Sequence, residues 1–297
     1  MRAFRAAGSW LGVFVLWMVH FLPMRWIGAI GSGLGWLLYQ FGRGHVTRVN
    51  LALAFPEMAE AERHAMGLRH FRMLGRNAVE LSVMVWGSER QLLELIRLEG
   101  LEHLQSAAAG GRPVIALAPH FIGLNMGGIR VAHAYPGTAS IYSRQKNPVL
   151  DRVFLKARTR FGNPYLVSRQ EGLRSVIRVI KTGKPFYFLP DMDFGIRDAI
   201  FSPFFGVPTA TITALPRLAR LTGASVVPVI TRQEGKGYVA RCYPAWEDYP
   251  TGDVEADVRR MNAFIEERVR EMPEQYFWAH KRFKTRPPGE PNPYKRK

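Results

Sequence analysis

Apolar and polar positions along most of the chain group into blocks that predict strands separated by helices. Short continuous apolar runs are typical of buried strands, whereas apolar residues that recur every three to five positions indicate helices. The expected strands are 113–119, 137–142, 184–190 and 225–231, with 237–244 nearer an edge, and the expected helices are 148–160, 170–182, 211–222 and 254–271. This alternation predicts an α/β fold with a central, mostly parallel or mixed sheet and helices on both faces.

A long helical pattern, residues 60–86, precedes these strands. Before it lie two apolar runs, residues 10–22 and 26–41, and the first is too short to match the roughly twenty residues of a spanning helix. A signal peptide is the least favoured interpretation, because no small-residue cleavage site precedes the second run and no disulfide framework follows. A spanning helix and an amphipathic anchor in the membrane interface both stay open.

We therefore expect an N-terminal membrane-attached helix ahead of the α/β domain. Trp10, Trp17, Trp26 and Trp36 suit the headgroup zone at either depth. The spacing of Gly31 and Gly35 permits close packing of helices. The expected organisation is an anchoring segment (1–44), one catalytic domain (45–290) and a basic tail (291–297).

Charge narrows the class of partner. The chain has 41 Lys and Arg against 24 Asp and Glu, a net charge of +17, and the excess lies in residues 1–56, 141–186 and 281–297. Such surfaces attract anionic membranes, acidic proteins, phosphorylated ligands or nucleic acid. Nucleic acid ranks below the others because the chain has no zinc-finger, basic-zipper or RNA-recognition signature. Cys242 is the only cysteine, which favours a reducing, cytoplasmic compartment.

The segment APHFIGLNMGG (118–128) carries the candidate chemistry. His120 follows an apolar strand, and the carboxyl ends of strands are where α/β folds place ligands. A histidine there can remove a proton from a hydroxyl at neutral pH. Asn125 can approach it only if His120 lies in the loop and Asn125 in the first turns of the next helix. An asparagine can accept the second ring N–H, but it brings no charge to stabilise the imidazolium.

The same segment, with others along most of the chain, resembles the lauroyl and myristoyl transferase family of lipid A biosynthesis, within the wider lysophospholipid acyltransferase group. That family has His, four residues, then Asp or Glu, and this chain matches at His120 and departs at Asn125. The further matching segments are RVNLALAFPE (48–57), YSRQKNPVLD (142–151), LPDMDFG (189–195), FSPFFGVPTAT (201–211), VVPV (226–229) and YFWAHKRFKTRP (276–287).

The resemblance implies an O-acyltransferase that moves a fatty acyl chain from acyl carrier protein to a hydroxyl of a phosphorylated lipid A precursor in lipopolysaccharide biosynthesis. It implies action at the cytoplasmic face of the inner membrane, in contact with membrane lipids, with 45–290 as the acyltransferase domain. No cofactor and no metal are expected. His120 would act as the general base, with Asn125 as its partner in the family's motif.

The resemblance also assigns substrate-binding roles. Arg144 and Lys146 would bind phosphate or pantetheine, with Asn147 orienting their loop, although Ser143 interrupts the family's Tyr-Arg-Pro order. Asp191 and Asp193 follow an expected strand, where they would position substrate, brace the basic loop or form structural ion pairs. An acyl groove would be lined by Phe194, Phe201, Phe204 and Phe205, although aromatic clusters of this kind more often belong to the core. Trp278, His280 and Arg282 are most simply capping or surface residues, and Cys242 is most simply core.

Asn125 leaves three interpretations open. In the first, the enzyme is active because the amide suffices or another carboxylate substitutes. In the second, it is a catalytically weakened relative that binds lipid. In the third, it is an active relative with another acceptor, such as a lysophospholipid or an aminolipid.

Overall fold

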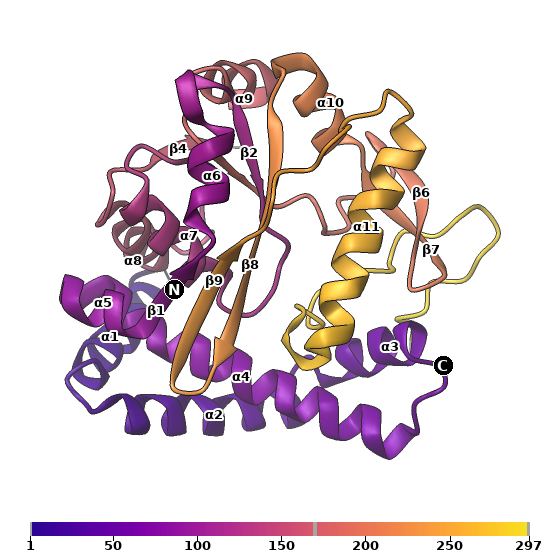
Figure 1. The fold of residues 1–297 in the computed structure, drawn as a ribbon. Helices are drawn as coiled ribbons and strands as arrows, with labels where there is room; N and C mark the ends of the chain where they lie inside the picture. The colour runs from indigo at the N-terminus through magenta and orange to yellow at the C-terminus, as the bar shows by residue number, and fades with distance from the viewer. Residues whose placement is uncertain (1, 169–170, 296–297) are drawn as a thin grey trace.

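A seven-stranded mixed sheet lies at the centre of the molecule (Figure 1). The computed structural model describes residues 2–168 and 171–295. The strand order is β1-β9-β8-β2-β5-β3-β4, and every neighbouring pair is parallel except β8 and β9. The strands are β1 (Ile96–Glu99), β2 (Val114–Leu117), β3 (Ala139–Tyr142), β4 (Tyr165–Ser168), β5 (Phe186–Phe188), β8 (Ser225–Glu234) and β9 (Gly237–Cys242). The predicted α/β class and mostly parallel sheet are confirmed.

Helices cover both faces of this sheet, as expected. Alternate residues of β2 point to opposite faces, so Ile115 and Leu117 join one core cluster while Val114 and Ala116 join another. The first cluster includes α9, α10 and α11, and the second includes α6 and α7. The helices after the first strand are α6 (Leu101–Ala107), α7 (Leu124–Ala134), α8 (Pro148–Thr159), α9 (Gly172–Ile180), α10 (Ala214–Thr222) and α11 (Val254–Glu271), with 3₁₀ turns η1 (Ala109–Gly111) and η3 (Pro273–Gln275).

A separate hairpin, β6 (Ala199–Phe204) and β7 (Val207–Ile212), packs beside α11 (Figure 1). Its two-residue turn has Phe205 at φ 53° and Gly206 at φ 72°, the left-handed pair that tight hairpins require. The hairpin differs from expectation, because this segment was expected only to match the family and to carry aromatic residues of a groove.

The N-terminal third is helical: α1 (Arg2–Val19), α2 (Met24–Phe41), α3 (Gly44–Ala54), α4 (Glu60–Trp86) and α5 (Glu89–Leu95). Figure 1 shows α2 running along α4 at the base of the molecule. The two backbones touch at Gly35, where a Cβ would lie 2.0 Å from the Phe71 carbonyl oxygen. This confirms the close packing that the glycine spacing permits, and it fixes α2 to the domain.

No helix in the described part of the chain is both long enough and apolar enough to cross a bilayer. The expected membrane-attached helix is therefore not confirmed. At the other end, the expected basic tail folds back through residue 295: the buried Tyr294 hydroxyl bonds Asn50 on α3 and accepts from the Phe283 N–H. Residues 296 and 297 lie outside the described residues.

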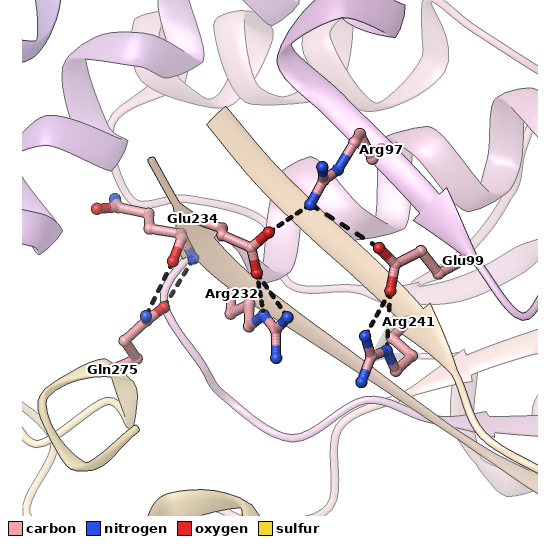
Figure 2. Close-up of polar contacts among 7 residues, drawn as sticks. Arg97, Glu99, Arg232, Glu234, Arg241 and Gln275 are labelled. Atoms are coloured by element: carbon pink, nitrogen blue, oxygen red, sulfur yellow. Dashed lines mark hydrogen bonds and ion pairs between the residues drawn. The ribbon is translucent and has the colours of Figure 1, made fainter. Parts of the chain in front are cut away.

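Alternating charges tie the β1 edge of the sheet together (Figure 2). Arg241 on β9 donates twice to Glu99 on β1, at 2.9 and 2.7 Å. Arg97 on β1 bonds Glu234 on β8, and Arg232 also donates to Glu234, at 2.9 Å. These pairs are exposed, so each contributes at most about 1 kcal/mol, but together they fix the register of three strands.

Candidate active site

His120 and Asp191 form the centre of the candidate site. Each lies three residues beyond the paired positions Leu117 on β2 and Phe188 on β5, at the carboxyl ends of adjacent parallel strands. The His120 Nδ1 lies 2.7 Å from one Asp191 carboxylate oxygen, and the His120 backbone N–H donates to the other at 2.9 Å. The carboxylate is 1% exposed, whereas the imidazole is 22% exposed.

The electrostatics of this pair fix the imidazole tautomer. Burial opposes ionisation of Asp191, but the His120 ring, the two hydrogen bonds from His120 and the charge of Arg282 outweigh it and lower the pKa of this carboxyl. An ionised carboxylate only accepts, so Nδ1 carries a proton and donates it to Asp191. In the neutral form of the ring, this tautomer has its lone pair on Nε2, and the side chain is partly exposed.

A C-terminal segment holds the His120 loop in place from its other side. The Phe277 N–H donates to the His120 carbonyl at 2.9 Å, and the Ile122 N–H donates to the Gln275 carbonyl at 2.7 Å. Gln275 also binds both backbone groups of Gln233 on β8, at 2.7 and 3.0 Å, as a neighbouring strand would (Figure 2). His120 is thus supported by the sheet and by the segment after α11.

Asn125 does not make the ring contact expected of it. It lies in the first turn of α7, which begins after Gly123, a residue at φ 93° that lets the chain turn out of the His120 loop. The Asn125 amide oxygen accepts a hydrogen bond from Arg158 on α8 at 2.9 Å. The carboxylate beside Nδ1 is Asp191, so the possibility that another carboxylate substitutes matches the geometry.

A pocket opens on the α7 side of the sheet. It has a volume of about 80 Å³ and lies between α7 and strands β3, β4 and β5. Its apolar lining residues are Leu124, Ile129, Ala132, Ala139, Ile141, Pro164, Leu166 and Leu189, and its polar ones are Asn125, Thr138, Ser140, Arg158 and Tyr187. Neither His120 nor Asp191 lines this pocket, but Leu124 begins α7 shortly after His120 and Leu189 lies shortly before Asp191 in the chain.

The other predicted polar residues occupy the segment before α8. Arg144 is 82% exposed and lies 3.8 Å from Asp151, and Lys146 is exposed. Asn147 is the N-cap of α8: its side-chain oxygen accepts from the N–H groups of Val149 and Leu150, and its amide donates to Ser9 on α1 at 2.7 Å. The fold thus orders this loop through Asn147 and leaves both cations at the surface.

Asp193 braces the C-terminal segment. Its carboxylate accepts from the Thr285 N–H at 2.8 Å, the Thr285 hydroxyl at 2.9 Å and the Gly195 N–H at 2.9 Å. The Asp193 N–H donates to His280 Nε2 at 3.3 Å, and burial is the main reason that the pKa of His280 falls to about 4. Phe194, between these groups, is exposed.

Three expected features of this region are wrong. Phe204 is fully buried against Tyr276 and Phe283, so it cannot line an open groove. Trp278 and Arg282 are buried too, not at the surface. These buried groups occupy the place where segments 48–57 and 276–287 meet, because Asn50 donates to the carbonyls of Trp278 and His280 at 2.7 Å. The two segments therefore lie against each other in the fold.

Cys242 is a buried core thiol. Burial raises its pKa to about 12, so the nucleophilic thiolate is scarce at neutral pH. Among the described residues, no three His, Cys, Asp or Glu side chains gather in a way that could hold a metal ion.

Arg158 and the pairing of His120 with Asp191 were not predicted from the sequence. A signal for the pairing was present: ALAP and FLP are two apolar strand ends that both finish in proline, followed directly by His120 and by Asp191. Two parallel strands in register bring the residues after such ends together. Arg158 carried no comparable signal, because it is one of eleven basic residues in its region.

The chain is similar in sequence to known proteins over most of its length. A family model described as "Bacterial lipid A biosynthesis acyltransferase" matches residues 1–285. The lipid A biosynthesis lauroyltransferase of Escherichia coli (strain K12) is 35% identical over 291 residues, covering 96% of this chain and 94% of that protein. The palmitoleoyltransferase of the same strain is 33% identical, with the same coverage, and the myristoyltransferase is 32% identical, covering 98% and 91%.

Proposed function

The chain belongs to the bacterial lipid A biosynthesis acyltransferase family, and from this premise we propose that it transfers a fatty acyl chain from acyl carrier protein to a hydroxyl of a lipid A precursor, with His120 as general base. That it is an acyltransferase of lipopolysaccharide biosynthesis follows from its relatives. The observation that supports the base is the 2.7 Å contact of His120 Nδ1 with the buried Asp191 carboxylate.

The reaction proceeds in one transfer. His120 Nε2 takes the proton of the acceptor hydroxyl as its oxygen attacks the thioester carbonyl carbon. The new C–O bond forms, the C–S bond breaks, and the thiolate leaves with the electron pair of that bond and takes the proton from the imidazolium. Asp191 stabilises the imidazolium between these steps, a role that an amide could not fill. No acyl-enzyme is needed.

The pocket between α7 and β3 is the proposed site of the acyl chain near its thioester end. Its aliphatic lining suits a hydrocarbon, and it adjoins the strand ends that carry His120 and Asp191. Asn125 and Arg158 are among the polar groups of this pocket, and their 2.9 Å hydrogen bond holds the guanidinium at its wall. Asn125 is thus a substrate-binding residue in this proposal, and Asp191 is the partner of the base.

The exposed side of α8 is the proposed contact for the acidic carrier protein. One exposed side of α8 carries basic residues spaced four apart: Arg152, Lys156 and the C-cap residue Arg160. Two further exposed cations, Arg144 and Lys146, lie in the loop before the helix. Arg158 points from the same helix to the pocket, so a carrier docked on α8 would sit near the pocket. Binding should weaken steeply as salt rises, because long-range attraction between opposite charges is screened.

We place the protein at the cytoplasmic face of the inner membrane, attached through α1 and α2. The exposed apolar side chains of these helices and of the turn between them include Trp10, Leu11, Phe14, Phe21, Trp26, Leu38 and Phe41, the last 85% exposed. The packing of α2 along α4 supports an anchor that lies in the interface plane. Cosedimentation with anionic vesicles tests this, and the double variant Phe21→Glu/Phe41→Glu should lose most of the binding.

An assay of purified protein in mixed micelles tests the proposed function. Acyl carrier protein loaded with C12, C14 or C16:1 chains is offered with a lipid A precursor, a lysophospholipid or no acceptor. Transfer to the lipid A precursor is the expected result. Transfer only to the lysophospholipid would show that a lysophospholipid, and not a lipid A precursor, is the acceptor. Binding without turnover on any acceptor would favour the catalytically weakened relative.

A further inference from the structure

Arg282 is a buried cation that the general-base mechanism has not used. It is 1% exposed, in the C-terminal segment after α11. Its guanidinium donates to the Ala210 carbonyl and to the Thr211 hydroxyl, both at 2.9 Å, and lies 5.1 Å from the centre of the Phe204 ring. Within the described parts of the chain, no carboxylate lies at ion-pair distance from this guanidinium. A buried charge without a close counter-ion is costly and calls for an explanation.

Tyr276 connects the surroundings of Arg282 to Asp191. The buried Tyr276 hydroxyl donates to the Asp191 carbonyl at 3.4 Å, and the Tyr276 ring packs against Phe204, the ring that the Arg282 guanidinium also contacts. The positive charge of Arg282 is among the causes that lower the pKa of Asp191. Two opposite buried charges are therefore linked through Phe204 and Tyr276, with low-dielectric protein between them.

From this geometry we propose that Arg282 is a positioning residue for the acyl transfer: its charge keeps the buried Asp191 ionised without requiring a protonated His120. A buried carboxylate needs positive charge nearby to stay ionised. Arg282 supplies such a charge, so the ionised state of Asp191 does not depend on an imidazolium, which could not accept the proton of the acceptor hydroxyl.

The other charged groups around the pair do not replace Arg282. His280 has its pKa lowered to about 4, mainly by burial, so it is neutral near pH 7. Lys284 is partly exposed, and its Nζ lies 3.9 Å from an Asp193 carboxylate oxygen. Its charge is therefore paired with Asp193 and not with Asp191. The hydroxyl of Tyr276 is a neutral donor, since burial raises its pKa well above the usual range. Arg282 is the remaining buried cation on the C-terminal side.

The test is the pH dependence of kcat/KM in Arg282→Met. This inference rests on His120 as the proposed base, so His120→Ala is measured beside it. We expect the rising limb of the Arg282→Met profile to move to higher pH, with activity reduced about tenfold or more at pH 7 and largely recovered near pH 9. Arg282→Lys, which keeps the charge, should retain the parental profile. Lys281→Met, which removes an exposed cation one residue away, is the matched control and should change nothing.

Each outcome of these measurements either supports or contradicts the role of Arg282. If Arg282→Met loses activity by the same factor at every pH, the residue is only structural and the inference is wrong. If Arg282→Lys moves the limb as far as Arg282→Met, the charge is not the cause. If His120→Ala remains active, the proposed base fails whatever Arg282 does. Should Arg282→Met not fold, Asp191→Asn/Arg282→Met decides by urea unfolding: a double variant that folds supports the coupling, and one that does not fold overturns it.

Discussion

His120 and Asp191 face each other because β2 and β5 are adjacent, parallel and in register, with Leu117 opposite Phe188. Each side chain lies three residues beyond its paired position. The sheet therefore sets the geometry of the pair. The C-terminal segment holds the His120 backbone in place through the hydrogen bond from the Phe277 N–H to the His120 carbonyl. Rigid elements on both sides are what a general base needs to keep its orientation through turnover.

Asp191→Asn tests the partner of the base. The amide cannot stabilise the imidazolium and can stabilise the wrong ring tautomer, so kcat should fall on the order of 10³ to 10⁴ with KM little changed. The measurement is steady-state transfer from acyl carrier protein to the lipid A precursor, with circular dichroism to check folding. A folded variant that keeps a tenth or more of the parental kcat would show that Asp191 is not the partner.

Asn125→Asp tests whether this position limits the enzyme. Because Asn125 contacts Arg158 and not the His120 Nδ1, the new carboxylate should pair with the guanidinium and change kcat less than about threefold. Asn125→Ala, which releases Arg158, should instead alter the preference among C12, C14 and C16:1 donors. A tenfold or greater gain in kcat for Asn125→Asp would contradict this assignment and mark the native site as weakened.

The buried His70 should make the free energy of unfolding depend on pH. Its Nδ1 bonds the Glu274 carbonyl at 2.9 Å, and burial lowers its pKa from 6.5 to about 4. The unfolded chain then binds more protons below pH 6.5, so the free energy of unfolding should fall by about 3 kcal/mol between pH 6.5 and pH 4. Urea unfolding across this range measures it.

His70→Asn, which keeps a donor for Glu274 but does not titrate, should flatten this dependence. His64→Asn, at an exposed position on the same helix, is the control and should keep the parental slope. An unchanged slope in His70→Asn would show that other groups cause the acid sensitivity.

Gly35→Ala tests the packing of α2 on α4. The added Cβ would lie 2.0 Å from the Phe71 carbonyl oxygen, so the helices must separate, at a cost of about 1–3 kcal/mol in the free energy of unfolding. Gly33→Ala is the matched control on the same helix, because its Cβ meets nothing within 4 Å. It should stabilise the helix by up to about 1 kcal/mol. Equal effects of the two variants would be incompatible with this close approach.

The sequence predicted the strands and helices whose patterns are long or strongly apolar. Residues 254–271 form α11, and 60–86 form α4, at the expected ends. The strand β1 was missed because IRLE follows the helical ERQLLEL without a break, and β4 was missed because an edge strand needs little apolar character. The hairpin of β6 and β7 was missed because its turn uses Phe205, a residue that rarely adopts a positive φ.

The sequence predicted several residues of the site but not which side chains contact one another. His120, Asp191 and Asp193 were named, but the partner of His120 was sought five residues away in the sequence, where a motif places it. The true neighbour is set by strand order, and β2 and β5 are separated in the chain by two strands that lie elsewhere in the sheet. Arg282 was expected at the surface. Its burial depends on how the hairpin and α11 pack together, and the pattern of apolar and polar residues does not predict that packing.

The transfer rate of His120→Ala tests the proposed mechanism most directly. Acyl carrier protein thioester and lipid A precursor are mixed with equal amounts of folded parental and variant protein at pH 7, and product is followed over time. With Nε2 as the base, the variant should retain less than about one thousandth of the parental kcat while still binding both substrates. Product formation by the variant at the parental rate would contradict the role of His120.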